Sequence, residues 1–143
     1  MEALLDTLAP LATTPAAPST RTRWVGWLIT ALPVLFLLFD GTIKLAQIPA
    51  VSEAFVRMGL PHCLASTIGV LELSCLALYL MPRTAPLGAI LLTGFLGGAI
   101  SLHVRIGDPL FSHTFFPLYM GIPLWIGLYL RDARVRGLIT AGR

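Results

Sequence analysis

Four long apolar stretches limit what this chain can fold into. They cover about residues 24–45, 64–81, 87–103 and 114–130. The hydrocarbon core of a bilayer is about 30 Å thick, and a helix of about 20 apolar residues crosses it. Only 12% of the residues are charged, about half the share in an ordinary soluble domain. The sequence therefore predicts an all-α protein, a bundle of four transmembrane helices that crosses a cell (inner) membrane several times.

The length of 143 residues indicates one domain and leaves no room for a separate soluble one. We expect a flexible cytoplasmic tail over residues 1–23, where prolines break any helix. A four-helix membrane domain should cover residues 24–136, and a short basic tail residues 137–143. The first apolar stretch ends in Asp-Gly-Thr-Ile-Lys and has no small-residue cleavage site, which favours a retained span over a signal peptide.

The connections between the stretches differ in length. Residues 82–86 form a turn so short that the flanking helices must be antiparallel neighbours. Residues 47–62 are longer, and Val51, Phe55 and Met58 recur there at helical spacing. This spacing predicts a short helix on the membrane surface.

The distribution of Lys and Arg predicts the orientation, because cytoplasmic loops carry an excess of these residues. One side of the predicted bundle holds seven of the ten, namely Arg21, Arg23, Arg83, Arg131, Arg134, Arg136 and Arg143. The other side holds Lys44, Arg57 and Arg105. Both termini should therefore be cytoplasmic. The basic residues stand at the ends of apolar stretches and form no stripe, so no nucleic acid partner is expected.

Five ionisable residues converge in the outer half of the predicted bundle. At a rise of 1.5 Å per residue, Asp40 lies about 24 Å and Lys44 about 30 Å from the cytoplasmic end of their stretch. His103 lies at a depth of about 24 Å on the third stretch, with Arg105 just beyond it, and Glu72 lies about 12 Å below the outer surface. An ionisable group inside a bilayer costs about 2.5 to 3.5 kcal/mol on insertion scales, and such groups are usually paired and functional.

The pairing of these five residues is partly set by spacing. Asp40 and Lys44 are one helical turn apart and can pair with each other. Glu72 needs a partner from another helix, and the candidates are Lys44, His103 and Arg105. Two interpretations remain open: a buried network that fixes the register of the bundle, or a pocket for a quinone, a lipid-like molecule or a proton in transit.

Gly94 and Gly98 form a pair of small residues one turn apart, which lets another helix approach closely. We expect them to pack against a neighbouring span, with a homo-oligomer interface as the alternative. The three histidines show no local ligand spacing, so no metal or haem motif is present. The sequence also holds no stand-alone catalytic motif, and enzyme activity stays undecided.

Several segments together resemble the DoxX-like family of small four-helix membrane proteins. They are Asp40-Gly41-Thr42-Ile43-Lys44-Leu45, Phe55 with Gly59-Leu60-Pro61, Ile68-Gly69-Val70-Leu71-Glu72-Leu73, and Gly97-Gly98-Ala99 with His103. The resemblance covers roughly residues 24–136. It implies a membrane bundle whose relatives include a subunit associated with a terminal quinol oxidase and proteins of thiol-redox or electron-transfer assemblies. Lys44, Glu72 and His103 are the positions that it singles out.

The leading hypothesis is a small membrane subunit that binds a quinone-like or lipid-like molecule in an outer-leaflet polar pocket and supports a redox or respiratory complex. Its expected partners are the lipid bilayer, a membrane redox complex and a second copy of the chain. The first alternative is a structural or assembly partner of another membrane protein. A proton or solute transporter is a third hypothesis, which the absence of a visible inverted repeat disfavours.

Overall fold

The computed structural model describes residues 17–140, and every regular element in that range is a helix, which confirms the all-α prediction. Most of the predicted amino-terminal tail and the last three residues lie outside the described residues. The elements are α2 (Thr20–Ala46), α3 (Pro49–Arg57), α4 (Leu64–Leu80), α5 (Ala85–Arg105), the π-helical turn η2 (Leu110–Thr114), α6 (Phe116–Arg131) and α7 (Ala133–Thr140). The four apolar stretches coincide with α2, α4, α5 and α6.

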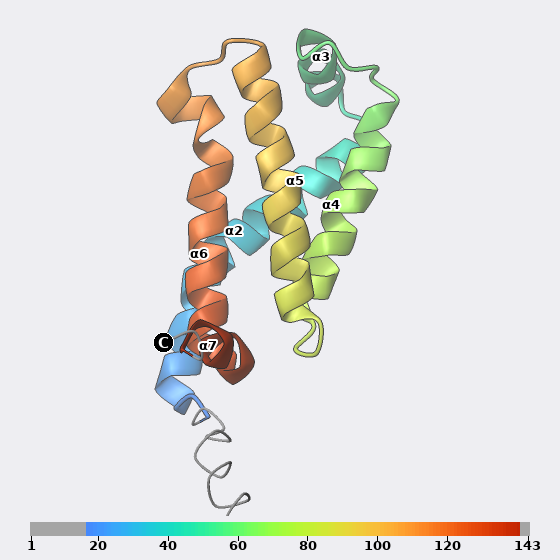
Figure 1. Ribbon diagram of the computed structural model, residues 1–143. Coiled ribbons are helices and arrows are strands. Elements are labelled where there is room, and N and C mark those ends of the chain that lie inside the picture. Colours follow the sequence, from blue (N-terminus) through green and yellow to red (C-terminus); the bar gives the residue numbers. More distant parts are fainter. Residues whose placement is uncertain (1–16, 141–143) are drawn as a thin grey trace, which may run out of the picture.

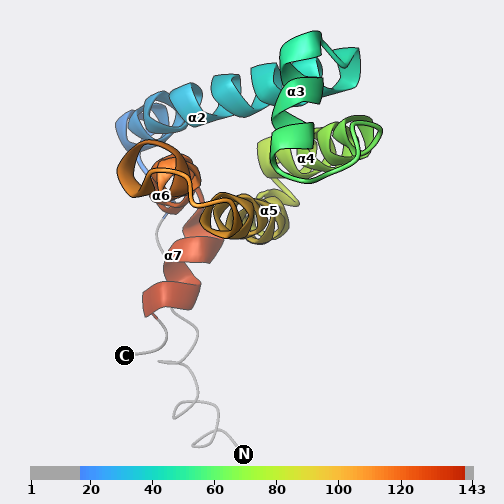
Figure 2. The ribbon, with the colours of Figure 1, turned by 90° about the horizontal axis from the view of Figure 1, so that it is seen from above.

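The four long helices form a ring (Figures 1 and 2). α2 packs against α4 and α6, and α5 packs against the same two helices. Seen from above, α2 lies along one side of the ring, with α4, α5 and α6 on the other sides. This order leaves the space between the four helices to be filled by side chains.

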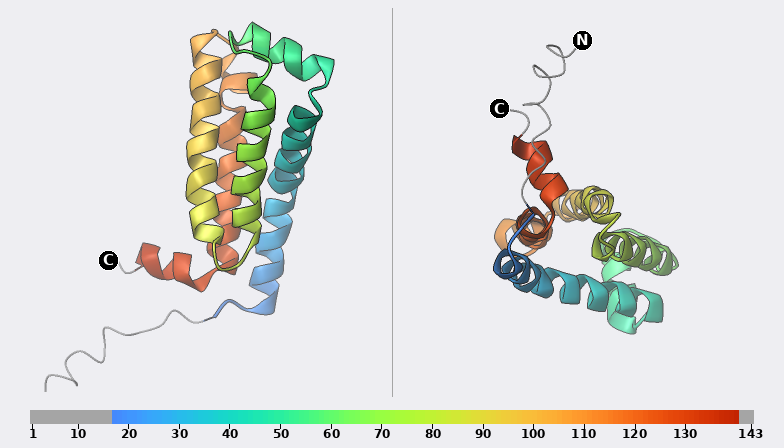
Figure 3. Two further views of the ribbon diagram at one scale, coloured as in Figure 1. Left: turned by 90° about the vertical axis from the view of Figure 1, so that its right-hand side faces the viewer. Right: turned by 90° about the horizontal axis from the view of Figure 1, so that it is seen from below.

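The short elements lie at opposite ends of the bundle (Figure 3). α3 lies across one end, as its helical spacing predicts, and buries Val51 and Phe55 in a small apolar cluster with Ala65 of α4. α7 lies at the other end, beside the start of α2 and the α4–α5 turn. The helix over Ala133–Thr140 was not predicted, because its arginine-rich sequence reads as a basic tail.

At the α7 end the bundle is tightly closed. A Cβ added to Gly88 of α5 would lie 2.2 Å from the backbone nitrogen of Tyr79 of α4, so these two backbones touch. The hydroxyl of Tyr79 donates a hydrogen bond to the carbonyl of Leu124 in α6 at 2.8 Å. Arg131 stacks its guanidinium 3.9 Å from the centre of the Trp27 ring of α2. Because this end is closed, a cavity inside the bundle can lie only in the half near α3.

α2 and α6 also make a close crossing, which depends on two glycines. A Cβ added to Gly127 would lie 2.2 Å from Cγ2 of Thr30 and 2.6 Å from the carbonyl oxygen of Gly26. Thr30 cannot easily move away, because its hydroxyl donates to the carbonyls of Gly26 and Trp27. The contact therefore requires glycine at position 127.

We predict that Gly127→Ala lowers the free energy of unfolding by about 1 to 3 kcal/mol, the usual cost of overpacking, although alanine favours a helix over glycine. Thermal unfolding in detergent measures the change. Gly121→Ala on the same helix is the matched control, because its Cβ would meet only Leu96 Cδ1 at 3.4 Å. Equal losses in both variants would contradict the assigned crossing.

Much of the outer surface of the bundle is apolar. Leu28 and Leu32 of α2 are each 71% exposed, and Ile90 of α5 is 59% exposed. Monomeric soluble proteins rarely expose large contiguous apolar patches. Among the described residues, α2 and α5 have the length and apolar composition to cross a membrane, and α4 is apolar but shorter. Lipid is the solvent that suits this surface.

Candidate functional site

The site begins with a close crossing of α2 and α4. A Cβ added to Gly69 of α4 would lie 2.9 Å from the carbonyl oxygen of Gly41 and 3.0 Å from Cβ of Lys44. Side chains on a helix lean toward its amino terminus. The side chain of Lys44 therefore points back along α2 toward Asp40. The side chain of Glu72 points toward the amino-terminal end of the antiparallel α4, and so toward Lys44. The crossing at the two glycines thus brings three charged groups together.

These groups form an ion-paired triad of Asp40, Lys44 and Glu72. Lys44 Nζ donates to Asp40 Oδ2 at 2.6 Å and to Glu72 Oε2 at 2.8 Å. The exposed fraction of the side chain is 28% for Asp40, 14% for Lys44 and 0% for Glu72. The second oxygen of Glu72, Oε1, has no hydrogen-bond partner among the described residues. Of the three partners that the sequence left open for Glu72, the structure selects Lys44.

His103 pairs within its own end of α5. Its Nδ1 lies 2.6 Å from Oδ2 of Asp108. Gly107 has φ of +71°, and this turn lets the amide of Asp108 donate back to the carbonyl of His103 at 3.1 Å. The hydrogen bond from His103 lowers the pKa of the Asp108 carboxyl below its usual value. Asp108 was missed by the sequence analysis, although a Gly-Asp pair directly after a helix is a signal for such a turn.

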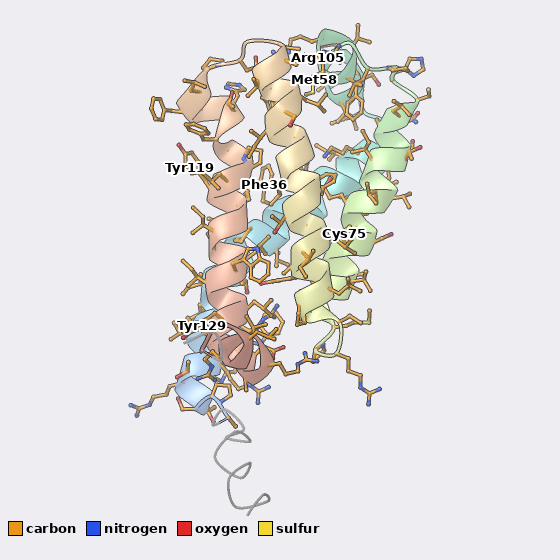
Figure 4. All side chains as sticks on the ribbon, in the orientation of Figure 1. Phe36, Met58, Cys75, Arg105, Tyr119 and Tyr129 are labelled. Atoms are coloured by element: carbon orange, nitrogen blue, oxygen red, sulfur yellow. The ribbon has the colours of Figure 1, made fainter. Side chains whose placement is uncertain are left out.

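Arg105 lies apart from the triad. A Cβ added to Gly59 would lie 2.7 Å from Nη2 of Arg105, so the guanidinium rests on the turn that follows α3. Figure 4 shows Arg105 near Met58, at the α3 end of the bundle. The structure therefore brings together Asp40, Lys44 and Glu72, and places Arg105 as a contact between α5 and the end of α3.

A cavity of about 870 Å³ lies between the helices in the half of the bundle near α3. Most of its lining is apolar. The titratable side chains in the lining are those of Asp40, Lys44 and His103, together with the thiol of Cys75. Val51 and Phe55 of α3 are part of the lining. Glu72 lies behind Lys44 and is outside the lining. The predicted polar residues thus contribute three groups to an otherwise apolar cavity.

Aromatic residues that the sequence analysis did not single out also line this cavity. The Phe95 ring centre lies 5.4 Å from Nζ of Lys44, within reach of a cation–π interaction. Phe36 and Phe116 meet edge to face, with ring centres 4.9 Å apart. Figure 4 shows Phe36 and Cys75, both in the lining, near the middle of the bundle. No motif marks these residues, because isolated aromatics in apolar stretches are common.

Gly94 and Gly98 do not hold a neighbouring helix of this chain. A Cβ added to either would meet no atom of the described residues within 4 Å beyond its local helix backbone, and both glycines line the cavity. The large apolar residues of the lining that are exposed include Leu71 of α4, Ile90 and Leu91 of α5, and Phe36 of α2. We therefore place an opening of the cavity between α4 and α5, with the two glycines along its edge.

An all-helical bundle with an apolar exterior, an internal ion-paired triad and an apolar cavity defines a small membrane protein. The family comparison agrees: the model of the DoxX-like family matches residues 28–127. The chain belongs to the DoxX-like family, which confirms the resemblance seen in its motifs. No curated protein and no solved structure matched the chain.

Proposed function

We propose that α2, α4, α5 and α6 each cross an inner membrane and that both termini are cytoplasmic. α4 has 17 residues and α6 has 16, or roughly 25 Å each at 1.5 Å per residue. Flanking polar residues and local thinning of the bilayer accommodate such short spans. The excess of Arg at the end that holds α7 and the α4–α5 turn supports the orientation. The cavity then lies in the outer-leaflet half.

We propose that the protein binds a quinone-like or lipid-like molecule in this cavity. The observation that carries the proposal is the combination of a large apolar lining with Asp40, Lys44 and His103. A volume of about 870 Å³ falls in the usual range of about 300 to 1,000 Å³ for small-molecule sites. A few polar groups in an apolar pocket fix the orientation of a ligand, while the walls take its apolar body.

The wider role that we propose is a subunit that supports a redox or respiratory complex by holding this molecule. Its support is the resemblance of the motifs around Lys44, Glu72 and His103 to a family with members in such assemblies. In this role the chain binds and orients the molecule, and the partner complex carries out the chemistry.

Extraction of molecules that copurify with the protein tests the binding. We expect mass spectrometry to find one defined apolar molecule with a polar head, enriched several-fold over bulk lipid. His103→Leu should reduce the enrichment, because His103 lines the cavity. His113→Leu is the matched control, since His113 is exposed and outside the lining. Wild-type extracts with the composition of bulk lipid would overturn the proposed binding.

A structural or assembly role is the second candidate, and the triad favours it. Lys44 reaches carboxylates on both α2 and α4, so the network fixes how these helices pack whether or not a molecule is bound. A stable complex with another membrane protein, purified with an empty cavity, would support this candidate over the first.

A further inference from the structure

The polar side chains that line the cavity are dominated by hydrogen-bond acceptors. Asp40 in the lining and Glu72, which lies behind Lys44 and outside the lining, share the one ammonium of Lys44. Of the three N–H groups of that ammonium, one donates to each carboxylate. The ammonium also lies near the Phe95 ring, whose centre is 5.4 Å away. Lys44 therefore keeps one of its three N–H groups for a ligand.

Asp40 offers the first free acceptor. Only its Oδ2 is bonded to Lys44, and the side chain is 28% exposed and lines the cavity. A carboxylate accepts hydrogen bonds at both oxygens. Its Oδ1 is therefore available to an O–H or N–H group of a molecule in the cavity.

His103 offers a second acceptor in the form of its ring that carries a single proton. Its Nδ1 faces the Asp108 carboxylate at 2.6 Å, and an ionised carboxylate can only accept, so Nδ1 carries the proton. When the ring carries this one proton, its other nitrogen, Nε2, is an acceptor. Because His103 lines the cavity, this nitrogen favours a donor group on the ligand.

The nearest basic residues outside the cavity do not offset the excess of hydrogen-bond acceptors at its polar end. Arg57 and Arg105 lie at the same end of the bundle, but both are exposed and neither lines the cavity. Water screens exposed charges strongly, whereas Asp40 and Lys44 act across an apolar space. The ammonium of Lys44 already pairs with Asp40 in the lining and with the buried Glu72 behind it, so an anionic head group would be a third negative charge beside that cation.

We infer that the cavity selects apolar molecules whose head group donates hydrogen bonds, such as an alcohol or an amine, and rejects carboxylate head groups. This inference rests on the proposed function, since it specifies the class of molecule bound at the same site. The opening between α4 and α5 gives such molecules a path from the surrounding lipid.

Chain-matched probes test the selection. The full-length protein in lipid nanodiscs is incubated with radiolabelled tetradecanol, tetradecylamine, methyl tetradecyl ether or tetradecanoate, and retention is measured against empty nanodiscs. We expect the alcohol and the amine to be retained at least tenfold more than the ether and the carboxylate. Retention of the carboxylate equal to or above that of the amine would overturn the inference.

Two variants with the same change in charge separate the site from the general field of the protein. Asp40→Asn should narrow the preference for the amine over the carboxylate about tenfold. Glu53→Gln removes an exposed carboxylate on α3 that does not line the cavity, and it should leave the preference unchanged. Equal retention of all four probes would overturn the selection and leave binding intact. No retention of any probe would overturn the proposed binding itself.

Discussion

Replacing Lys44 with methionine is expected to lower the free energy of unfolding by about 3 to 5 kcal/mol, the usual cost of removing one partner from a buried ion pair. Methionine keeps the length of the side chain, so the loss comes mainly from charge. Glu72 is fully buried, and without Lys44 its carboxylate faces Asp40 with no cation between them. Unfolding in mixed micelles with an increasing fraction of sodium dodecyl sulfate measures the change.

A double variant shows whether the loss comes from the pair. Lys44→Met combined with Glu72→Leu removes the uncompensated carboxylate, and we expect it to recover most of the stability that Lys44→Met loses. Arg105→Met is the matched control, because it removes an exposed cation from the same end of the bundle, and its effect should stay below about 1 kcal/mol. Additive losses in the double variant would show that Lys44 and Glu72 do not act as a pair.

The sequence predicted the helices well because the signal for them is long and strong. Apolar stretches of this length have few alternatives, and their bounds differ from those of the helices by only a few residues. The pair of Asp40 and Lys44 was also predictable, since residues four apart on one helix are neighbours. The helices and the Asp40–Lys44 pair were therefore predicted from local periodicity along the sequence.

The cross-helix contacts were harder to predict, because they depend on the register between helices. Lys44 was one of three candidates for Glu72, and the crossing at Gly41 and Gly69 decides among them. The sequence around a glycine in an apolar helix does not indicate which residue, if any, packs against it. Gly69 meets another backbone, whereas Gly98 faces a cavity, and the sequence assigned the packing role to the second of these.

The position of Gly98 leads to the second large expected effect, on ligand retention. Gly98→Leu should reduce the retention of tetradecanol in nanodiscs at least tenfold, because the new side chain enters the cavity at its opening. A Cβ added to Gly98 would meet no atom of the described residues within 4 Å beyond its own stretch of helix, so the fold has room for the change. Leucine also favours a helix over glycine by nearly 1 kcal/mol, and unfolding should show no loss of stability.

Gly97→Leu is the matched control for that experiment. Gly97 is also exposed, and a Cβ added to it would meet no described residue within 4 Å beyond its own stretch of helix, but it lies outside the cavity lining. The same substitution one residue away therefore adds an equal apolar side chain to a different face of α5. Loss of retention in Gly98→Leu alone assigns binding to the cavity. Equal loss in both variants would instead indicate that the outer face of α5 matters, as it would if a second copy of the chain packed there.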